Sequence, residues 1–210
     1  MKTLSLLLLI LFISCGKPTT FEHPDTSTSI ESTAYWPAYK LPATIKVPRE
    51  KFEKFQEIFL EVQEEYEIAV GRPLIKFIPD DNKYSLKNFS ESKKIKGSNF
   101  LMFKEDEQNF LDVILPTMGI TQVSWFVPNM KIYQAHIVIN FSKGEMEINL
   151  FKEVLLHEIG HFLGFNHVEN EDSIMSEFID HSLAGLRDFD IERIKKKYLK
   201  PAINSTLAHH

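Results

Sequence analysis

Apolar residues recur at two different spacings along this chain, and the spacing separates expected helices from expected strands. Over residues 49–70 they step by three and four, which predicts a long amphipathic helix ended by Gly71 and Pro73. A second helix is expected after Asn149 as its cap, and a last helix after Asp188. Short alternating or continuous apolar stretches predict strands over residues 42–48, 74–78, 99–103, 120–127 and 132–141. This order of strands and helices indicates an α+β fold.

The second expected helix carries the run HEIGHFLGFNH, whose three histidines have the spacing of a metal site. His157 and His161 are four residues apart, so on a helix their imidazoles project from one face toward a common ion. Gly164 can adopt the left-handed conformation that ends a helix, which allows His167 to return as a third ligand. Three histidines leave the fourth tetrahedral position of a zinc ion open for water, as in a catalytic site.

Glu158 follows the first histidine and is expected beside the metal position, where its carboxylate can take a proton from the metal-bound water. A metal reserve or a scaffold has no need of such a carboxylate. The complete set therefore favours hydrolysis, with a non-catalytic zinc-binding envelope lipoprotein as the alternative. A third interpretation, hydrolysis of a cell-wall cross-link, uses the same chemistry and differs only in the substrate cleft.

The pattern H-E-x-x-H-x-x-G-x-x-H resembles the metzincin clan of zinc endopeptidases. Ser173-Ile174-Met175-Ser176 resembles the Met-turn of that clan, with Met175 as an apolar floor under the histidines. Within the clan, INLFKEVLLHEIGHFLGFNH and LRDFDIERIKKKYL are similar to the zinc helix and the C-terminal helix of the matrixins. The resemblance runs from about residue 41 to 199. It implies a metzincin-like catalytic domain with a mixed twisted sheet, a long first helix, a zinc helix, a Met-turn and a C-terminal helix.

By this resemblance the protein would be a zinc-dependent endopeptidase that cleaves proteins or peptides. His157, His161 and His167 would bind one catalytic zinc ion, and Glu158 would take the water proton and return it to the leaving amine. The substrate would lie extended along the strand at 120–127 and pair with it through backbone hydrogen bonds.

The chain also departs from the matrixin pattern. It has no propeptide cysteine to occupy the zinc, and only His136 falls where vertebrate matrixins bind structural metals. Because one imidazole does not make a tetrahedral site, we expect no structural zinc or calcium, and we expect His136 to face solvent or core. The Pro-x-Tyr wall of the specificity pocket is replaced by SEFIDHSL, in which we expect Glu177 and His181 to point to water.

The first residues predict an exported protein. Lys2 precedes an apolar run from Leu4 to Ile13, which is typical of a secretory signal peptide and too short to span a bilayer. Cys15 is the only cysteine, and LFISC resembles a bacterial lipobox. We therefore expect a lipid anchor at Cys15 and a place in the bacterial cell envelope, at the outer membrane or cell surface. The alternative is an ordinary signal peptide followed by an unrelated cysteine.

The expected organisation is a lipoprotein signal peptide at 1–14, a flexible tether at 15–40, one catalytic domain at 41–200 and a tail at 201–210. The tether is rich in Pro, Thr, Ser and acidic residues. The formal net charge of −5 disfavours nucleic acid as a partner. We expect a monomer that meets protein substrates at a membrane surface.

Overall fold

The computed structural model describes residues 34–82, 98–105, 118–126, 129–141, 146–177 and 185–199, and the backbone of residues 11–14. Several predicted features lie outside these residues: Cys15, most of the tether, His181 and the C-terminal tail. Within the described ranges, no helix combines the length and apolar character needed to cross a membrane.

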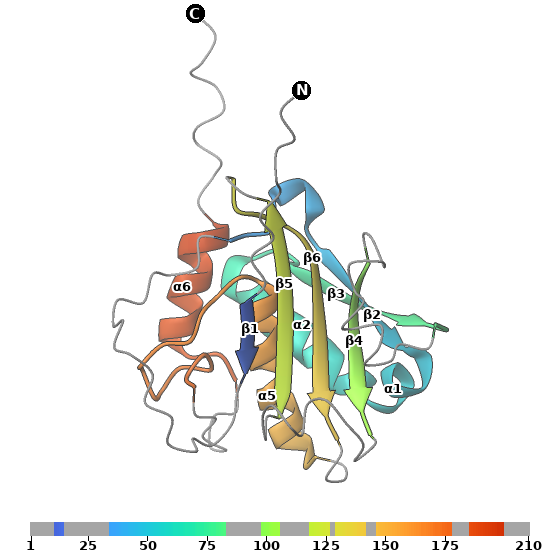
Figure 1. The fold of residues 1–210 in the computed structure, drawn as a ribbon. Coiled ribbons are helices and arrows are strands. Elements are labelled where there is room, and N and C mark those ends of the chain that lie inside the picture. The colour runs from blue at the N-terminus through green and yellow to red at the C-terminus, as the bar shows by residue number, and fades with distance from the viewer. Residues whose placement is uncertain are drawn as a thin grey trace, which may run out of the picture.

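A six-stranded mixed sheet forms the centre of the fold, in the order β1-β5-β6-β4-β2-β3 (Figure 1). The strands are β1 (Leu11–Ser14), β2 (Ala43–Pro48), β3 (Ile75–Asp80), β4 (Asn99–Lys104), β5 (Gly119–Phe126) and β6 (Lys131–Asn140). Strand β2 is parallel to β3 and β4, and β4 is parallel to β6, whereas β5 runs antiparallel to β6. The five strands expected from the sequence are thus confirmed, with ends that differ by one or two residues.

The helices of the described chain are α1 (Arg49–Lys54), α2 (Gln56–Val70), α5 (Ile148–Phe162) and α6 (Asp188–Tyr198), with a 3-10 turn η1 (Ala38–Lys40). Helices α2 and α5 lie behind the sheet in Figure 1, and α6 lies at its side. The helix expected over residues 49–70 is present but interrupted, because the backbone at Phe55 leaves helical geometry (φ −116°, ψ 23°) and separates α1 from α2. The Phe55 ring packs at this break among the core rings of Phe103, Phe141 and Phe151. Tertiary packing therefore overrides the continuous apolar period of the sequence.

Both predicted N-caps are wrong. Helix α5 begins at Ile148 with Glu147 as its cap, so Asn149 lies in the first turn, where its Nδ2 donates to Glu147 Oε1 at 3.2 Å. The cap of α6 is Arg187, whose N–H donates to the carboxylate of Asp190 at 3.2 Å. Asp190 thus supplies the acceptor from the third helical position, so Asp188 is not needed as a cap.

The chain just before residue 41 already packs on the folded domain, although the predicted tether extends to residue 40. Trp36 is 3% exposed, and its Nε1 donates to the carbonyl of Phe162 at 2.8 Å while the two rings stack. Two backbone hydrogen bonds tie Tyr35 to the start of β6. The N–H of Tyr35 donates to the carbonyl of Met130, and the N–H of Ile132 donates to the carbonyl of Tyr35. These contacts hold Trp36 against the C-terminal end of α5 and Tyr35 against the start of β6.

Among the described residues from 34 onward, β5 and β3 are the two outer strands of the sheet. The edge of β5 lies next to the candidate site. Along this edge runs β1, antiparallel, with Leu11 opposite Val123 and Ser14 opposite Ile120. Strand β1 belongs to the segment that the sequence predicts as a signal peptide. The pairing shows that the β5 edge accepts an extended antiparallel chain through its backbone groups.

Candidate metal centre

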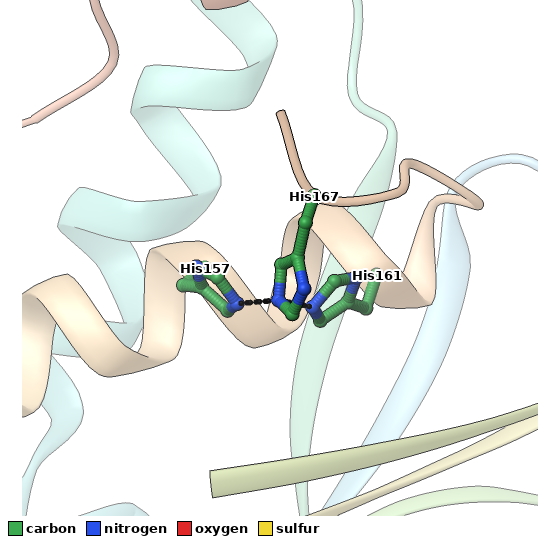
Figure 2. A group of neighbouring side chains, drawn as sticks. All are labelled: His157, His161 and His167. Atoms are coloured by element: carbon green, nitrogen blue, oxygen red, sulfur yellow. Dashed lines mark hydrogen bonds between the residues drawn. The ribbon is translucent and has the colours of Figure 1, made fainter. Parts of the chain in front are cut away.

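The three histidines of the motif converge from α5 and the loop that follows it. His157 and His161 project from one face of α5, and His167 comes back between them (Figure 2). Gly164 has φ +82°, and a Cβ there would run into the carbonyl of Ala34. The N–H of Gly164 donates to the carbonyl of His161 at 2.8 Å, and the next N–H donates to that of Gly160 at 3.0 Å. This is the hydrogen-bond pair that closes a helix at a left-handed glycine, as the sequence predicts.

The imidazole nitrogens are spaced as zinc ligands. His167 Nε2 lies 3.2 Å from His157 Nε2 and 3.1 Å from His161 Nε2. Nitrogens bound tetrahedrally to one zinc ion are about 3.3 Å apart. His157 Nδ1 lies 2.6 Å from the carbonyl of Ile174, and His161 Nδ1 lies 2.8 Å from that of Phe165. Because a carbonyl only accepts, both Nδ1 atoms carry the proton and both Nε2 atoms present lone pairs, so the site fits a zinc ion.

Burial keeps these imidazoles in the neutral form that binds metals. It lowers the pKa of His157 to about 3 and holds that of His161 well below its usual value. The pKa of His167 is also lowered by burial, partly offset by the negative charge of Glu177. No proton therefore has to leave these rings before an ion binds near neutral pH.

The predicted Met-turn lies directly under the histidines. Met175 is buried against Gly160 of α5, where an added Cβ would run into its sulfur. The N–H of Val168 donates to the Met175 carbonyl at 3.0 Å, which ties the turn to the loop that carries His167. The carbonyl of the preceding residue, Ile174, is the acceptor for His157 Nδ1. The turn thus fixes the orientation of a candidate ligand besides packing beneath it.

Asp190 of α6 holds the Met-turn in place. Its Oδ1 accepts from the Ser173 hydroxyl at 2.5 Å, and its Oδ2 accepts from the N–H groups of Ile174 at 3.0 Å and Arg187 at 3.2 Å. A buried carboxylate with three donors is well compensated for its loss of water. Helix α6 is thereby connected through Ile174 to His157.

Glu158 lies beside the three histidines on the side of α5 that faces β5. Its carboxylate is buried, and Oε2 accepts from the Thr121 hydroxyl at 2.5 Å. Burial raises the pKa of Glu158 to about 8, and the hydrogen bond from Thr121 works against that rise. Oε1 has no hydrogen-bond partner among the described residues. One oxygen is thus held by Thr121, and the other is buried beside Gly119 without a hydrogen-bond partner in the described part of the chain.

The sequence also led to expectations for two polar residues outside the motif, His136 and Glu177. His136 lies in the core, stacked on Phe100, with Nε2 3.1 Å from the carbonyl of Ser98. Burial lowers its pKa to about 4, so it is a neutral strand residue inside the sheet. Glu177 is exposed, as expected. Within the described ranges, one group of side chains is close enough together to hold a metal ion, and it consists of His157, His161 and His167.

Three contributors to the site were not found by sequence reasoning: Thr121, Gly119 and the carbonyl of Ile174. Thr121 is fully buried in β5, but this strand also carries Gln122 and Ser124, so the sequence offers no signal that singles Thr121 out. The role of Asp190 as an acceptor was not foreseen either, although Asp190 lies in the stretch LRDFDIERIKKKYL that resembles the matrixin C-terminal helix. Each of these contacts joins segments far apart in the sequence.

The mixed sheet, the helix with two histidines and a glutamate, the returning third histidine and the methionine turn define a catalytic domain of the metzincin class. The matrixin family model matches residues 57–199, from α2 to the end of α6. The chain belongs to the matrixin family of metallopeptidases. No curated protein matches it significantly.

Proposed function

We propose that this protein is a zinc-dependent endopeptidase in which Glu158 is the general base. The observation that carries the proposal is one constellation: three neutral imidazoles converge within 4.8 Å of one another, and a buried carboxylate follows the first of them on the same helix. Membership of the matrixin family supports peptide bonds as the substrate.

A bound zinc ion, held by His157, His161 and His167, would supply Lewis acidity toward the scissile carbonyl. The chain itself supplies the proton transfer. Glu158 Oε1 accepts a proton as a water oxygen bonds to the carbonyl carbon, and the carboxyl group returns that proton to the amine as the C–N bond breaks. Burial raises the pKa of Glu158 to about 8 in the zinc-free protein, and a bound zinc ion would lower that pKa because a nearby cation favours the carboxylate.

We propose that the substrate lies along the outer edge of β5. That edge ends at Gly119 and Thr121, the residues next to Glu158, so a chain paired there passes close to the base. Backbone pairing requires an extended polypeptide, which favours unfolded or flexible protein segments over a compact cross-link. The antiparallel seating of β1 supports this geometry.

The test is the substitution Glu158→Gln in the purified protein, with Glu57→Gln on the exposed face of α2 as the control. We expect one zinc ion per chain by atomic emission in the wild type and in both variants. Cleavage of an unfolded protein should be lost in Glu158→Gln and kept in the control. Full activity of Glu158→Gln would contradict the proposed role. Tight zinc binding by a wild type that cleaves nothing would favour the non-catalytic alternative.

We also propose that the enzyme works at the cell envelope, held there by acyl chains on Cys15. The support is the lipobox-like run LFISC after a short apolar segment. In a bacterial host, Cys15→Ser should move the protein from the membrane fraction to the soluble fraction. A wild type that is equally soluble would contradict the anchor and leave the proposed chemistry untouched.

A further inference from the structure

We propose that Thr121 is a positioning residue for Glu158: its hydroxyl, together with the open space at Gly119, holds the carboxylate with one oxygen turned toward the attacking water. This inference rests on the proposed function of Glu158 as the base. It concerns β5, which lies outside the histidine motif and is antiparallel to its neighbour β6.

Gly119 and Thr121 lie on one face of β5, because they are two residues apart in a strand. That face meets α5 at Glu158. A Cβ on Gly119 would lie 2.5 Å from Glu158 Oε1 and 2.8 Å from Cδ, distances that no real side chain tolerates. The carboxylate therefore lies flat against the strand backbone in space that only glycine leaves. The φ angle of Gly119 is not in the left-handed region, so the glycine is required for this closeness and not for its conformation.

Thr121 fixes the other side of the carboxylate. Its Oγ1 lies 2.5 Å from Glu158 Oε2 and 3.1 Å from the Glu158 backbone carbonyl. The hydroxyl has a single proton, and the shorter contact directs that proton to the carboxylate. Because Thr121 is completely buried, no solvent water competes for this bond. A glutamate side chain has three rotatable bonds, and a charge-assisted hydrogen bond in a dry site selects one arrangement among them.

The two oxygens of the Glu158 carboxylate have different surroundings. Oε2 accepts the proton of Thr121, whereas Oε1 is buried beside Gly119 and has no hydrogen-bond partner in the described part of the chain, which leaves it for the attacking water. The same strand offers its outer edge to an extended chain. Strand β5 would thus determine both the register of the substrate and the orientation of the Glu158 carboxylate. A displacement of β5 would change both together.

The test compares Thr121→Val, which keeps the shape and removes the hydroxyl, with Thr121→Ser, which keeps the hydroxyl. Thr44→Val, on the exposed side of β2, is the matched control. Each protein is loaded with zinc and assayed on an internally quenched peptide taken from a random library. We expect Thr121→Val to lower kcat about 10- to 100-fold with KM within about twofold of wild type, the size of a lost hydrogen bond to a charged group. Thr121→Ser should stay within about threefold of wild type.

A second measurement does not depend on activity. A crystal structure of zinc-free Thr121→Val should show the Glu158 carboxylate away from its place beside Gly119, and Gly119→Ala should displace it in the same way. An unchanged kcat in Thr121→Val, equal losses in the Val and Ser variants, or an unmoved carboxylate would overturn the inference. If the wild type cleaves nothing but the carboxylate moves, the proposed function fails while the positioning role stands.

Discussion

Replacing Asp190 with asparagine should destabilise the protein although the side chain keeps its size. The buried carboxylate accepts from the Ser173 hydroxyl and from the N–H groups of Ile174 and Arg187. Hydrogen bonds to a charged group contribute about 1.5–3 kcal/mol, and bonds to a neutral group about 0.5–1.5 kcal/mol. The asparagine oxygen can keep the two N–H donors as neutral bonds, while its NH2 group cannot accept the proton that the Ser173 hydroxyl donates to Asp190. We therefore expect a loss of about 3 kcal/mol in the free energy of unfolding.

The assay is urea unfolding followed by circular dichroism in the presence of a chelator, so that zinc does not contribute. Asp188→Asn is the control, because Asp188 is an exposed residue of the same helix turn and should cost no more than about 0.5 kcal/mol. The Asp190 variant should also bind zinc about tenfold more weakly, since Asp190 holds the residue whose carbonyl orients His157. Equal urea midpoints for Asp190→Asn and Asp188→Asn would refute the reasoning.

Gly164→Ala should cost more stability in urea unfolding than Gly71→Ala, because both have a left-handed φ but only Gly164 lacks room for a Cβ; equal losses would contradict this. In zinc-free protein burial raises the pKa of Glu158 to about 8, so the unfolded chain loses this proton at a lower pH than the folded chain does. The free energy of unfolding should therefore fall as the pH rises from about 5 to about 8. Glu158→Gln should remove that contribution in thermal unfolding, and identical pH profiles would exclude it. Trp36→Ala should cost about 3–5 kcal/mol, whereas Tyr39→Ala on the exposed turn should cost little, and similar effects would show that Trp36 does not belong to the folded domain.

The sequence predicted the parts of the site that one helix and one turn determine. His157 and His161 meet because they are four residues apart on a helix, and Gly164 marks where the chain must reverse to return His167. The strands could be predicted equally well, because alternating or continuous apolar residues indicate which stretches are buried. Local spacing was therefore sufficient for the metal ligands and for the strands of the sheet.

The features that were missed depend on contacts between distant segments. The break at Phe55 follows from rings on β4, α5 and the end of β6, which no local period reveals. Thr121 meets Glu158 only once β5 lies on α5, and Asp190 reaches the Met-turn only once α6 has docked. The helix caps were misplaced because the acceptor for α6 comes from inside the helix. Sequence patterns predict which residues are buried, but not which polar groups meet there.

The central claim is that the three histidines and Glu158 hydrolyse peptide bonds. Its most direct test is mass-spectrometric mapping of the products that the zinc-loaded protein makes from a peptide library, with Glu158→Gln in parallel. We predict cleavage at internal peptide bonds by the wild type and none by the variant, with one zinc ion bound to each. Intact peptides after incubation with a zinc-loaded wild type, or the same products from both proteins, would contradict it.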